Sequence, residues 1–232
     1  MGIYYNFKKI FNFKIPVILK KVFKKSYGRD NLDLKLEKYL NYSNGFFIEL
    51  GAHDGITQSN TYYYEKKKNW KGILIEPVPK LYKYCKKYRS KKNLFFCNAC
   101  VSFDFKNENV KLIYSNLMTT AIDLTTVQFR EKHLANPELN FFEKKKYFTA
   151  KARTLNSIMI EAKAPNVIDF FSLDVEGAEF EVLNGINFAK FNFRYILIET
   201  NNFEKLNNFM LQKKYKFIDK YNANDYLYTF LN

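Results

Sequence analysis

The segment Phe46-Phe-Ile-Glu-Leu-Gly-Ala-His-Asp-Gly55 decides the fold of this chain. Its first part, FFIELG (46–51), is a short apolar run that ends in a glycine, a pattern typical of a buried strand followed by a loop. Before it, LDLKLEKYLNY (32–42) has helical apolar spacing, and the pair Asn44-Gly45 stops that helix. We therefore predict a helix, a buried strand and a glycine-containing loop, in that order.

Strand-like and helix-like segments alternate from this point to the end of the chain. Further strands are predicted at 71–77, 93–102, 167–174 and 194–200, and a closing hairpin at 215–221 and 225–231. Helices are predicted at 59–70, with Ser59 as its N-cap, and at 80–90, 154–162, 177–186 and 202–215. This alternation is typical of a single-domain α/β fold with a mostly parallel seven-stranded sheet covered on both faces, into which the hairpin inserts one antiparallel strand.

The middle of the chain is less regular. Residues 109–116 and 146–154 have strand-like patterns, and residues 117–146 between them are expected to be an insertion of loop and helix. If the insertion folds over a ligand site, it acts as a lid.

Length and charge set the broad class. The chain has 232 residues, which suits one α/β domain over residues 31–232 that follows a basic segment at 1–30. The formal net charge of +15 has two explanations: a polyanionic partner, or a genome bias that over-uses Lys, Asn, Ile, Phe and Tyr together. We favour the bias, and we do not expect nucleic acid as a partner.

The N-terminal segment has a composition of its own. Residues 1–28 contain seven lysines and no acid, mixed with apolar side chains, and Pro16 interrupts any helix there. No apolar run approaches the ~20 residues that span a bilayer, and no cleavage site for export follows. The segment either lies on an anionic membrane surface or packs across the domain. We favour packing and expect a cytoplasmic protein, with peripheral contact at the inner membrane face as the alternative.

The three cysteines do not form an obvious framework. They stand at 85, 97 and 100, and an odd number without a signal peptide does not favour disulfides. Cys97 and Cys100 have the spacing of half a zinc site, but no second pair completes it. We expect a buried strand here.

Carboxylates gather where the predicted strands end. In a parallel sheet, ligands bind beyond the carboxyl ends of the strands. Helix capping accounts for Asp54 and Glu179 but leaves the other acids unexplained, since those end apolar strands. The acids at or next to strand ends are Glu49, Glu76, Asp174, Glu176 and Glu199.

The loop from Gly51 to Gly55 indicates which ligand these acids suit. A dinucleotide site needs three glycines at set places around a pyrophosphate, whereas this loop has the pattern G-x-x-x-G. Glu49 and Asp54 would repel a pyrophosphate and attract a cation. S-adenosylmethionine carries a sulfonium and an ammonium and no phosphate, and Glu76 is placed to bind its ribose hydroxyls. We therefore predict S-adenosylmethionine as the cofactor.

These residues also resemble a known family. FFIELGAHDGITQSNT (46–61), WKGILIEPVPKLY (70–82), RTLNSI (153–158) and FFSLDVEGAEFEVLNGI (170–186) look like the FkbM-type methyltransferases, in the same order and spacing from about Leu32 to the C-terminus. His53 stands where members usually carry Asn, which leaves the cofactor assignment intact. The resemblance implies a Rossmann-like class I methyltransferase fold, S-adenosylmethionine as donor and O-methylation of sugars or natural-product hydroxyls.

The expected site follows from these two arguments. Asp174 and Glu176 are the first candidates to take the proton of an acceptor hydroxyl, because strand 167–174 is expected beside strand 46–51. Glu179, one helical turn on, is the third catalytic candidate. A divalent metal held by Asp174 and Glu176 is a possible variant that we do not expect. The cofactor-binding residues are expected to be Glu49, Gly51, Ala52, His53, Asp54, Gly55, Ser59, Glu76, Pro77 and Asp174.

The predicted activity is transfer of a methyl group from S-adenosylmethionine to a hydroxyl of a glycan or related small molecule. One alternative keeps the chemistry and takes RNA or DNA as acceptor. Another is a non-catalytic, membrane-attached binding protein on the same fold, against which the intact Glu49, Glu76 and Asp174 argue. A nicotinamide-dependent oxidoreductase is disfavoured by the missing glycines.

Overall fold

The main sheet is mixed and has the predicted number of strands. The computed structural model describes residues 26–135 and 146–231, and within them seven strands form one sheet in the order β10-β11-β9-β8-β1-β2-β3. Its neighbours are parallel except for β11, which runs antiparallel to both β9 and β10. The predicted sheet with a C-terminal antiparallel hairpin is confirmed. The strands are β1 (Phe46–Leu50), β2 (Lys71–Ile75), β3 (Leu94–Phe96), β8 (Val167–Leu173), β9 (Asn192–Glu199), β10 (Tyr215–Tyr221) and β11 (Asp225–Phe230).

Alternation along β1 explains how both faces of the sheet are buried. Successive strand side chains point to opposite faces, and Phe47 and Ile48 belong to two different hydrophobic clusters. Leu36 and Trp70 lie in the cluster of Phe47, whereas Leu155 lies in that of Ile48. The helices that contribute to the two faces are α3 (Leu32–Lys35), α4 (Glu37–Leu40), α5 (Tyr62–Lys68), α6 (Pro79–Tyr88), α8 (Leu155–Glu161), α9 (Glu179–Leu183) and α10 (Phe203–Gln212). The exposed turn η1 (Arg29–Asn31) precedes them.

Two helices start later than the sequence predicts. The helix expected from Ser59 begins at Tyr62 with Thr61 as its N-cap, so the prediction of Ser59 as N-cap is wrong. The Ser59 hydroxyl still accepts from the Tyr62 amide at 3.0 Å, two residues before the helix cap, and it donates to the Glu49 carboxylate, 2.9 Å away. The helix expected over 177–186 shrinks to Glu179–Leu183, because Gly177 has a left-handed φ of 95°.

A second, smaller sheet was not foreseen. Its order is β4-β7-β5-β6, and the predicted strand 93–102 divides between the two sheets, with β3 in the main sheet and β4 in the small one. At the break, Asn98 donates its side-chain amide to the Lys151 carbonyl of β7, 3.1 Å away. Val110 and Ala150 pack in a separate core for this sheet. Its strands are β4 (Ala99–Cys100), β5 (Asn109–Tyr114), β6 (Thr120–Ala121) and β7 (Lys146–Arg153).

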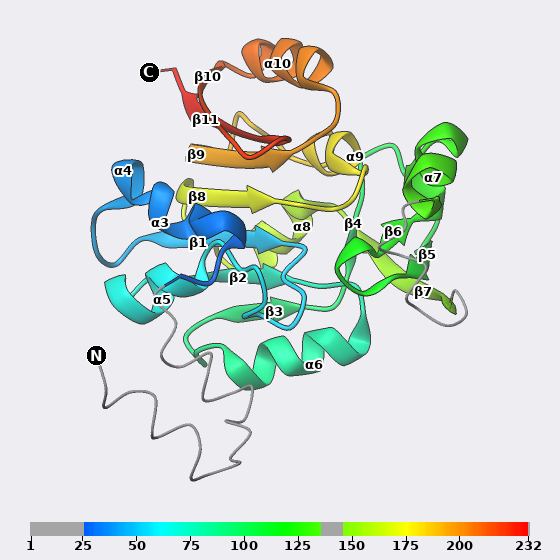
Figure 1. The fold of residues 1–232 in the computed structure, drawn as a ribbon, viewed down its shortest axis with the longest axis horizontal. Helices are drawn as coiled ribbons and strands as arrows, with labels where there is room; N and C mark the ends of the chain where they lie inside the picture. Colours follow the sequence, from blue (N-terminus) through cyan, green and yellow to red (C-terminus); the bar gives the residue numbers. More distant parts are fainter. Residues whose placement is uncertain (1–25, 136–145, 232) are drawn as a thin grey trace, which may run out of the picture.

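The small sheet stands at the end of the main sheet where the parallel strands finish. Figure 1 shows it, with α7 (Val127–Leu134), beyond the arrowheads of β8 and β9. Two short turns connect its strands, η2 (Asn116–Met118) and η3 (Ile122–Leu124). The expected insertion at 117–146 thus contains β6 and α7, while its residues 136–145 lie outside the described part of the chain.

The membrane hypothesis concerned the basic N-terminal segment. Its residues 1–25 lie outside the described residues, and residues 26–31 pack against the domain, where Gly28 forms a bridge with Gln58. Among the described helices, none combines the length and the apolar character needed to cross a bilayer.

Trp70 anchors the core on the face of Phe47. Its side chain is buried, and its indole N–H donates to the Tyr42 carbonyl at 2.7 Å. The rings of Tyr42 and Tyr64 each lie 5.1 Å from it, centroid to centroid. This tryptophan therefore serves packing.

Replacing Trp70 tests that role. Trp70→Ala leaves a large cavity and an unpaired Tyr42 carbonyl, so we expect a loss of about 3–5 kcal/mol in the free energy of unfolding, measured by urea titration. Tyr84→Ala is the matched control, because Tyr84 is 38% exposed on α6 and its loss should cost less than about 1 kcal/mol. Equal losses in the two variants would contradict the assignment.

Candidate active site

A cavity of about 730 Å³ opens at the carboxyl ends of the parallel strands. It is lined on one side by the ends of the main strands and on the other by residues of the small sheet and its turns. Its size is within the range of pockets that hold small molecules and cofactors. The expected ligand site at this edge of the sheet therefore has a physical space.

Five neighbouring strands each place one residue in a row along the floor of this cavity. Leu50 pairs with Ile75, and Leu173 pairs with Leu50 and with Ile198, so the residues that follow these pairs lie side by side. In the antiparallel pair of β9 and β11, Glu199 and Asp225 are direct partners. Adjacent strands are about 4.8 Å apart, which sets the spacing. All members line the cavity, and we call them the strand-end row: Glu76, Gly51, Asp174, Glu199 and Asp225.

Gly51 is the one member that must lack a side chain. Its φ is +88°, and a Cβ atom there would lie 2.0 Å from the carbonyl oxygen of Asp174. Its amide and that of Ala52 both donate to the Ile75 carbonyl at 3.1 Å. The backbone of the loop therefore crosses the floor between Glu76 and Asp174 without filling it.

The Glu49 carboxylate is held by hydrogen bonds from the protein itself. It accepts hydrogen bonds from Arg89 Nη1 at 2.9 Å, from Thr61 Oγ1 at 2.7 Å and from Ser59 Oγ. Arg89 is fully buried and also binds Glu65 at 2.7 Å. Glu49 and Ser59 line the cavity as expected, but their polar groups hold the loop 51–61 in place.

Arg89 is the residue that sequence reasoning missed. It stands in the exposed-looking run KKYRSKK (86–92), where nothing separates it from its lysine neighbours. The only signal was indirect: Glu49, in a buried strand, needs a counter-charge.

Removing Arg89 should therefore unfold the loop before it affects any chemistry. Arg89→Leu leaves Glu49 and Glu65 buried without a partner, and we expect a loss of about 3–5 kcal/mol in unfolding free energy. Lys86→Leu, on the exposed side of the same helix, is the control with little expected effect. Chemical denaturation measures both; unchanged stability in Arg89→Leu would refute the anchoring role.

Asp54 and Gly55 shape the loop and do not line the cavity. The Asp54 carboxylate accepts from the backbone of Ile56 and Thr57 and from the Thr57 hydroxyl. Burial acts to raise the pKa of Asp54, but the nearby His53 and these hydrogen bonds outweigh it and hold the pKa well below its ordinary range. Gly55 packs against Arg89, whose Cγ would lie 2.8 Å from a Cβ atom at this position.

His53 links the loop to both walls of the cavity. Its backbone N–H donates to Glu76 Oε2 at 2.8 Å, and its ring Nε2 lies 2.9 Å from Asn116 Oδ1 in η2. Glu76 also accepts from the Val78 amide at 2.9 Å. Burial raises the pKa of Glu76 to about 7, partly offset by these two amide donors. Ala52, His53, Glu76 and Pro77 all line the cavity.

The three catalytic candidates are brought together but have different exposure. Asp174 is open to the cavity. Partial loss of hydration there, followed by the charges of Glu199 and Glu176, raises the pKa of Asp174 well above its ordinary value. Glu176 lines the cavity, and burial followed by the charge of Glu199 raises its pKa to about 8. Glu179 is buried outside the lining; it accepts from the Gly177 amide at 2.8 Å, and burial raises its pKa to about 7.

Two acidic residues and one arginine of the site were not assigned from the sequence. Glu199 was noted at a strand end, but Asp225 begins a strand and so escaped a search of strand ends. Burial and Glu199 raise the pKa of Asp225 to about 6. Arg29 from the N-terminal segment is the one arginine or lysine among the described residues that line the cavity.

These raised pKa values predict how stability depends on pH. Values of about 8 for Glu176, about 7 for Glu179 and about 6 for Asp225 exceed the ordinary value of about 4 in an unfolded chain. The folded state therefore binds more protons than the unfolded state between about pH 5 and pH 8, and this contribution to stability falls as pH rises. Between about pH 5 and pH 8, the melting temperature of Glu176→Gln should fall less than that of the wild type. The melting temperature of the exposed control Glu204→Gln should fall as much as that of the wild type. Identical pH profiles for wild type and Glu176→Gln would contradict the raised pKa.

The cysteines and acids offer no metal centre within the described residues. No group of three or more His, Cys, Asp or Glu side chains there is placed to hold an ion. Cys100 is buried in β4, and the Cys97 thiol lies 3.8 Å from the Pro77 carbonyl.

Comparison with known proteins identifies the family. The model of the methyltransferase FkbM domain matches residues 49–226 of the 232 in the chain. Among solved structures, the precorrin-6y C5,15-methyltransferase of Geobacter metallireducens GS-15 is similar with 10% sequence identity and a TM-score of 0.42, over 89% of this chain and 90% of that one. None of the curated proteins compared matches the chain. The family match includes the whole strand-end row, and this chain belongs to the methyltransferase FkbM domain family.

Proposed function

We propose that this S-adenosylmethionine-dependent methyltransferase methylates a hydroxyl group of a sugar or a similar small acceptor. One observation carries the proposal: Asp174 and Glu176 line the same cavity as the loop around Gly51, beside the part of the row suited to the donor. A hydroxyl acceptor must lose a proton, and these carboxylates are within that cavity to receive it.

The residues present fit S-adenosylmethionine. Each oxygen of Glu76 accepts one backbone N–H and has further acceptor capacity, which two ribose hydroxyls would use. Asp174 makes no side-chain hydrogen bond or ion pair within the described residues, so its carboxylate is available for the donor's ammonium. Because Gly51 has no side chain, the space between these two acids stays open. When bound, this donor supplies a methyl carbon activated by a positive sulfur.

Glu176 is the best candidate for general base. Its pKa of about 8 makes it a stronger base than an ordinary carboxylate. Positive charge bound beside Asp174 lowers that pKa and favours the ionised form at neutral pH. The Glu176 carboxylate then takes the proton from the acceptor hydroxyl and holds it after the oxygen has gained the methyl group. Most of the remaining rate enhancement comes from orientation of the acceptor oxygen.

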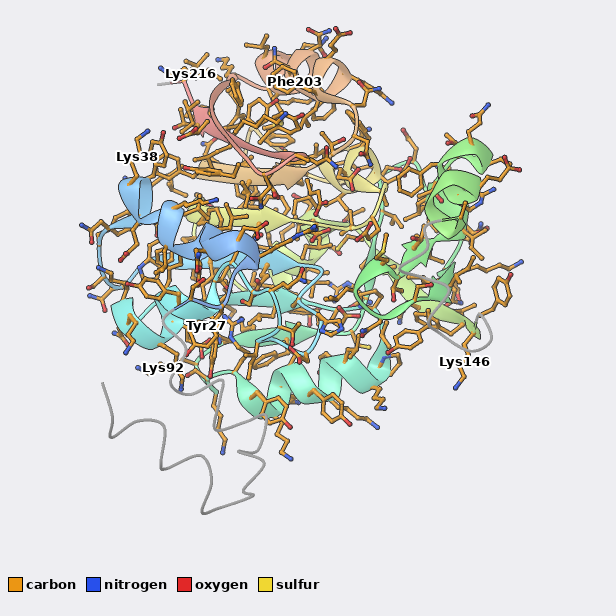
Figure 2. All side chains as sticks on the ribbon, viewed as in Figure 1. Tyr27, Lys38, Lys92, Lys146, Phe203 and Lys216 are labelled. Atoms are coloured by element: carbon orange, nitrogen blue, oxygen red, sulfur yellow. The ribbon has the colours of Figure 1, made fainter. Side chains whose placement is uncertain are left out.

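The charges of the cavity argue against a nucleic-acid acceptor. Six of the carboxylates described above line it together with Arg29, and phosphates entering it would be repelled. Figure 2 shows Lys38, Lys92, Lys146 and Lys216 at four separate places around the molecule. No lysine among the described residues lines the cavity, whereas a nucleic-acid footprint requires basic side chains around the site.

Two substitutions separate donor binding from catalysis. Glu76→Ala should weaken binding of S-adenosylmethionine by roughly 10- to 100-fold in calorimetric titration, because two charge-assisted hydrogen bonds are lost. Glu176→Gln should keep that affinity and lower turnover by about 10²- to 10⁴-fold on a hydroxylated acceptor. Glu204→Gln, an exposed carboxylate on α10, is the control for both.

Two different outcomes would contradict the base assignment and the methyl-transfer proposal. Full turnover in Glu176→Gln would remove Glu176 as the base while leaving the donor site intact. Absence of donor binding to the folded wild-type protein would overturn the methyl-transfer proposal itself.

A further inference from the structure

The outer part of the strand-end row contains a charge conflict that the fold does not resolve. Glu199 and Asp225 are direct cross-strand partners on β9 and β11. Like charges directly opposite one another destabilise a sheet. Asp225 accepts one hydrogen bond, from the Asn222 amide at 2.9 Å, and Glu199 makes no side-chain hydrogen bond or ion pair within the described residues.

Arg29 offsets the charge of this pair only in part: burial and the Glu199 carboxylate raise the pKa of Asp225 and outweigh the Arg29 guanidinium, which acts to lower it. Arg29 lines the cavity, but its side chain is 66% exposed and lies 3.8 Å from Asp30 on its own turn. A surface contact of this kind is screened by water and weak. The two carboxylates therefore face the cavity with an excess of negative charge, at a cost to the folded state that a ligand would offset.

The row assigns these acids to the acceptor and not to the donor. Glu76 and Asp174 flank Gly51 and are two strand spacings apart, or about 9.6 Å. In the proposed function, the donor occupies the space between these two acids. Glu199 is the next member beyond Asp174, and Asp225 the next again. A group held between Glu199 and Asp225 thus lies on the far side of Asp174 from the ribose acid.

The wall opposite the row has a different chemistry. Residues of the small sheet and its connections line the cavity with apolar side chains, and the Phe129 ring lies against Gly177, where a Cβ atom would be only 2.6 Å from it. The acceptor space therefore has one anionic side and one apolar side. The apolar lining residues are Leu117, Met118, Leu124 and Phe129.

We propose that Glu199 and Asp225 bind a protonated amine of the acceptor, which is a hydroxylated ring compound bearing an amino group, of the amino-sugar class. This inference rests on the proposed function. An ammonium between two carboxylates relieves their mutual repulsion, and the C–H face of a ring packs on the apolar wall. An acceptor with a carboxylate or phosphate at the same place would be repelled, so the pair determines specificity by charge.

The test compares three probes that share a ring and differ in charge: glucosamine, glucose and glucuronic acid. Each is titrated by calorimetry at neutral pH into the full-length protein saturated with S-adenosylhomocysteine. We expect glucosamine to bind at least about tenfold more tightly than glucose, and glucuronic acid to bind weakest. Affinity is measured without turnover, so the result does not depend on correct presentation of a particular hydroxyl.

Variants link the preference to the pair. Glu199→Gln should reduce the preference for glucosamine over glucose by about tenfold while S-adenosylhomocysteine affinity stays unchanged. The same variant should melt at a higher temperature than wild type, because the repulsion with Asp225 is gone. Glu204→Gln should alter neither quantity.

The possible results distinguish a failure of the proposed function from a failure of the amine assignment. Failure of S-adenosylhomocysteine itself to bind would overturn the proposed function. If it binds, then equal affinities for glucosamine and glucose, absence of binding by all three probes, or a preference that survives in Glu199→Gln would overturn the amine assignment alone.

Discussion

The ion pair between Arg89 and Glu49, buried beneath the loop that follows β1, is the interaction on which the site depends. Arg89 reaches from the end of α6 to Glu49 in β1 and to Glu65 in α5, and its own exposure is nil. One guanidinium thus joins a strand and two helices and also binds the Gly55 carbonyl at 3.0 Å. A buried carboxylate left without this partner would carry a large desolvation cost. The shape of the cavity floor follows from that single electrostatic requirement.

Sheet geometry then arranges the chemistry. Because neighbouring strands are evenly spaced, residues that end successive strands form a line, and their order in the line follows strand order instead of chain order. Glu76 and Asp174 are nearly a hundred positions apart in the chain yet flank the same glycine. The small sheet supplies the opposite wall and is tied to the loop through His53 and Asn116.

The parts that sequence reasoning reached are those set by local pattern. Apolar runs of strand length between amphipathic helices predicted the main sheet, and the acids at its ends line the cavity found there. The small sheet could not be reached in this way, since β4 has two residues and pairs with β7 about fifty positions later. Asp225 was hidden because its strand runs backwards, and Arg89 because burial is decided by tertiary packing. Ser59 was predicted as the N-cap, and although its hydroxyl accepts from the Tyr62 amide, the helix begins only after Thr61.

The division of the strand-end row has an evolutionary consequence. Glu76, Gly51 and Asp174 follow β2, β1 and β8, three strands whose residues are mostly buried. Glu199 and Asp225 come from β9 and β11, on the side of the sheet that ends in the terminal hairpin. Under the proposed assignment of these two acids to the acceptor, substitutions there after gene duplication would change what a copy accepts while its donor site stays intact. A lineage with this architecture can therefore diversify its substrates through very few mutations.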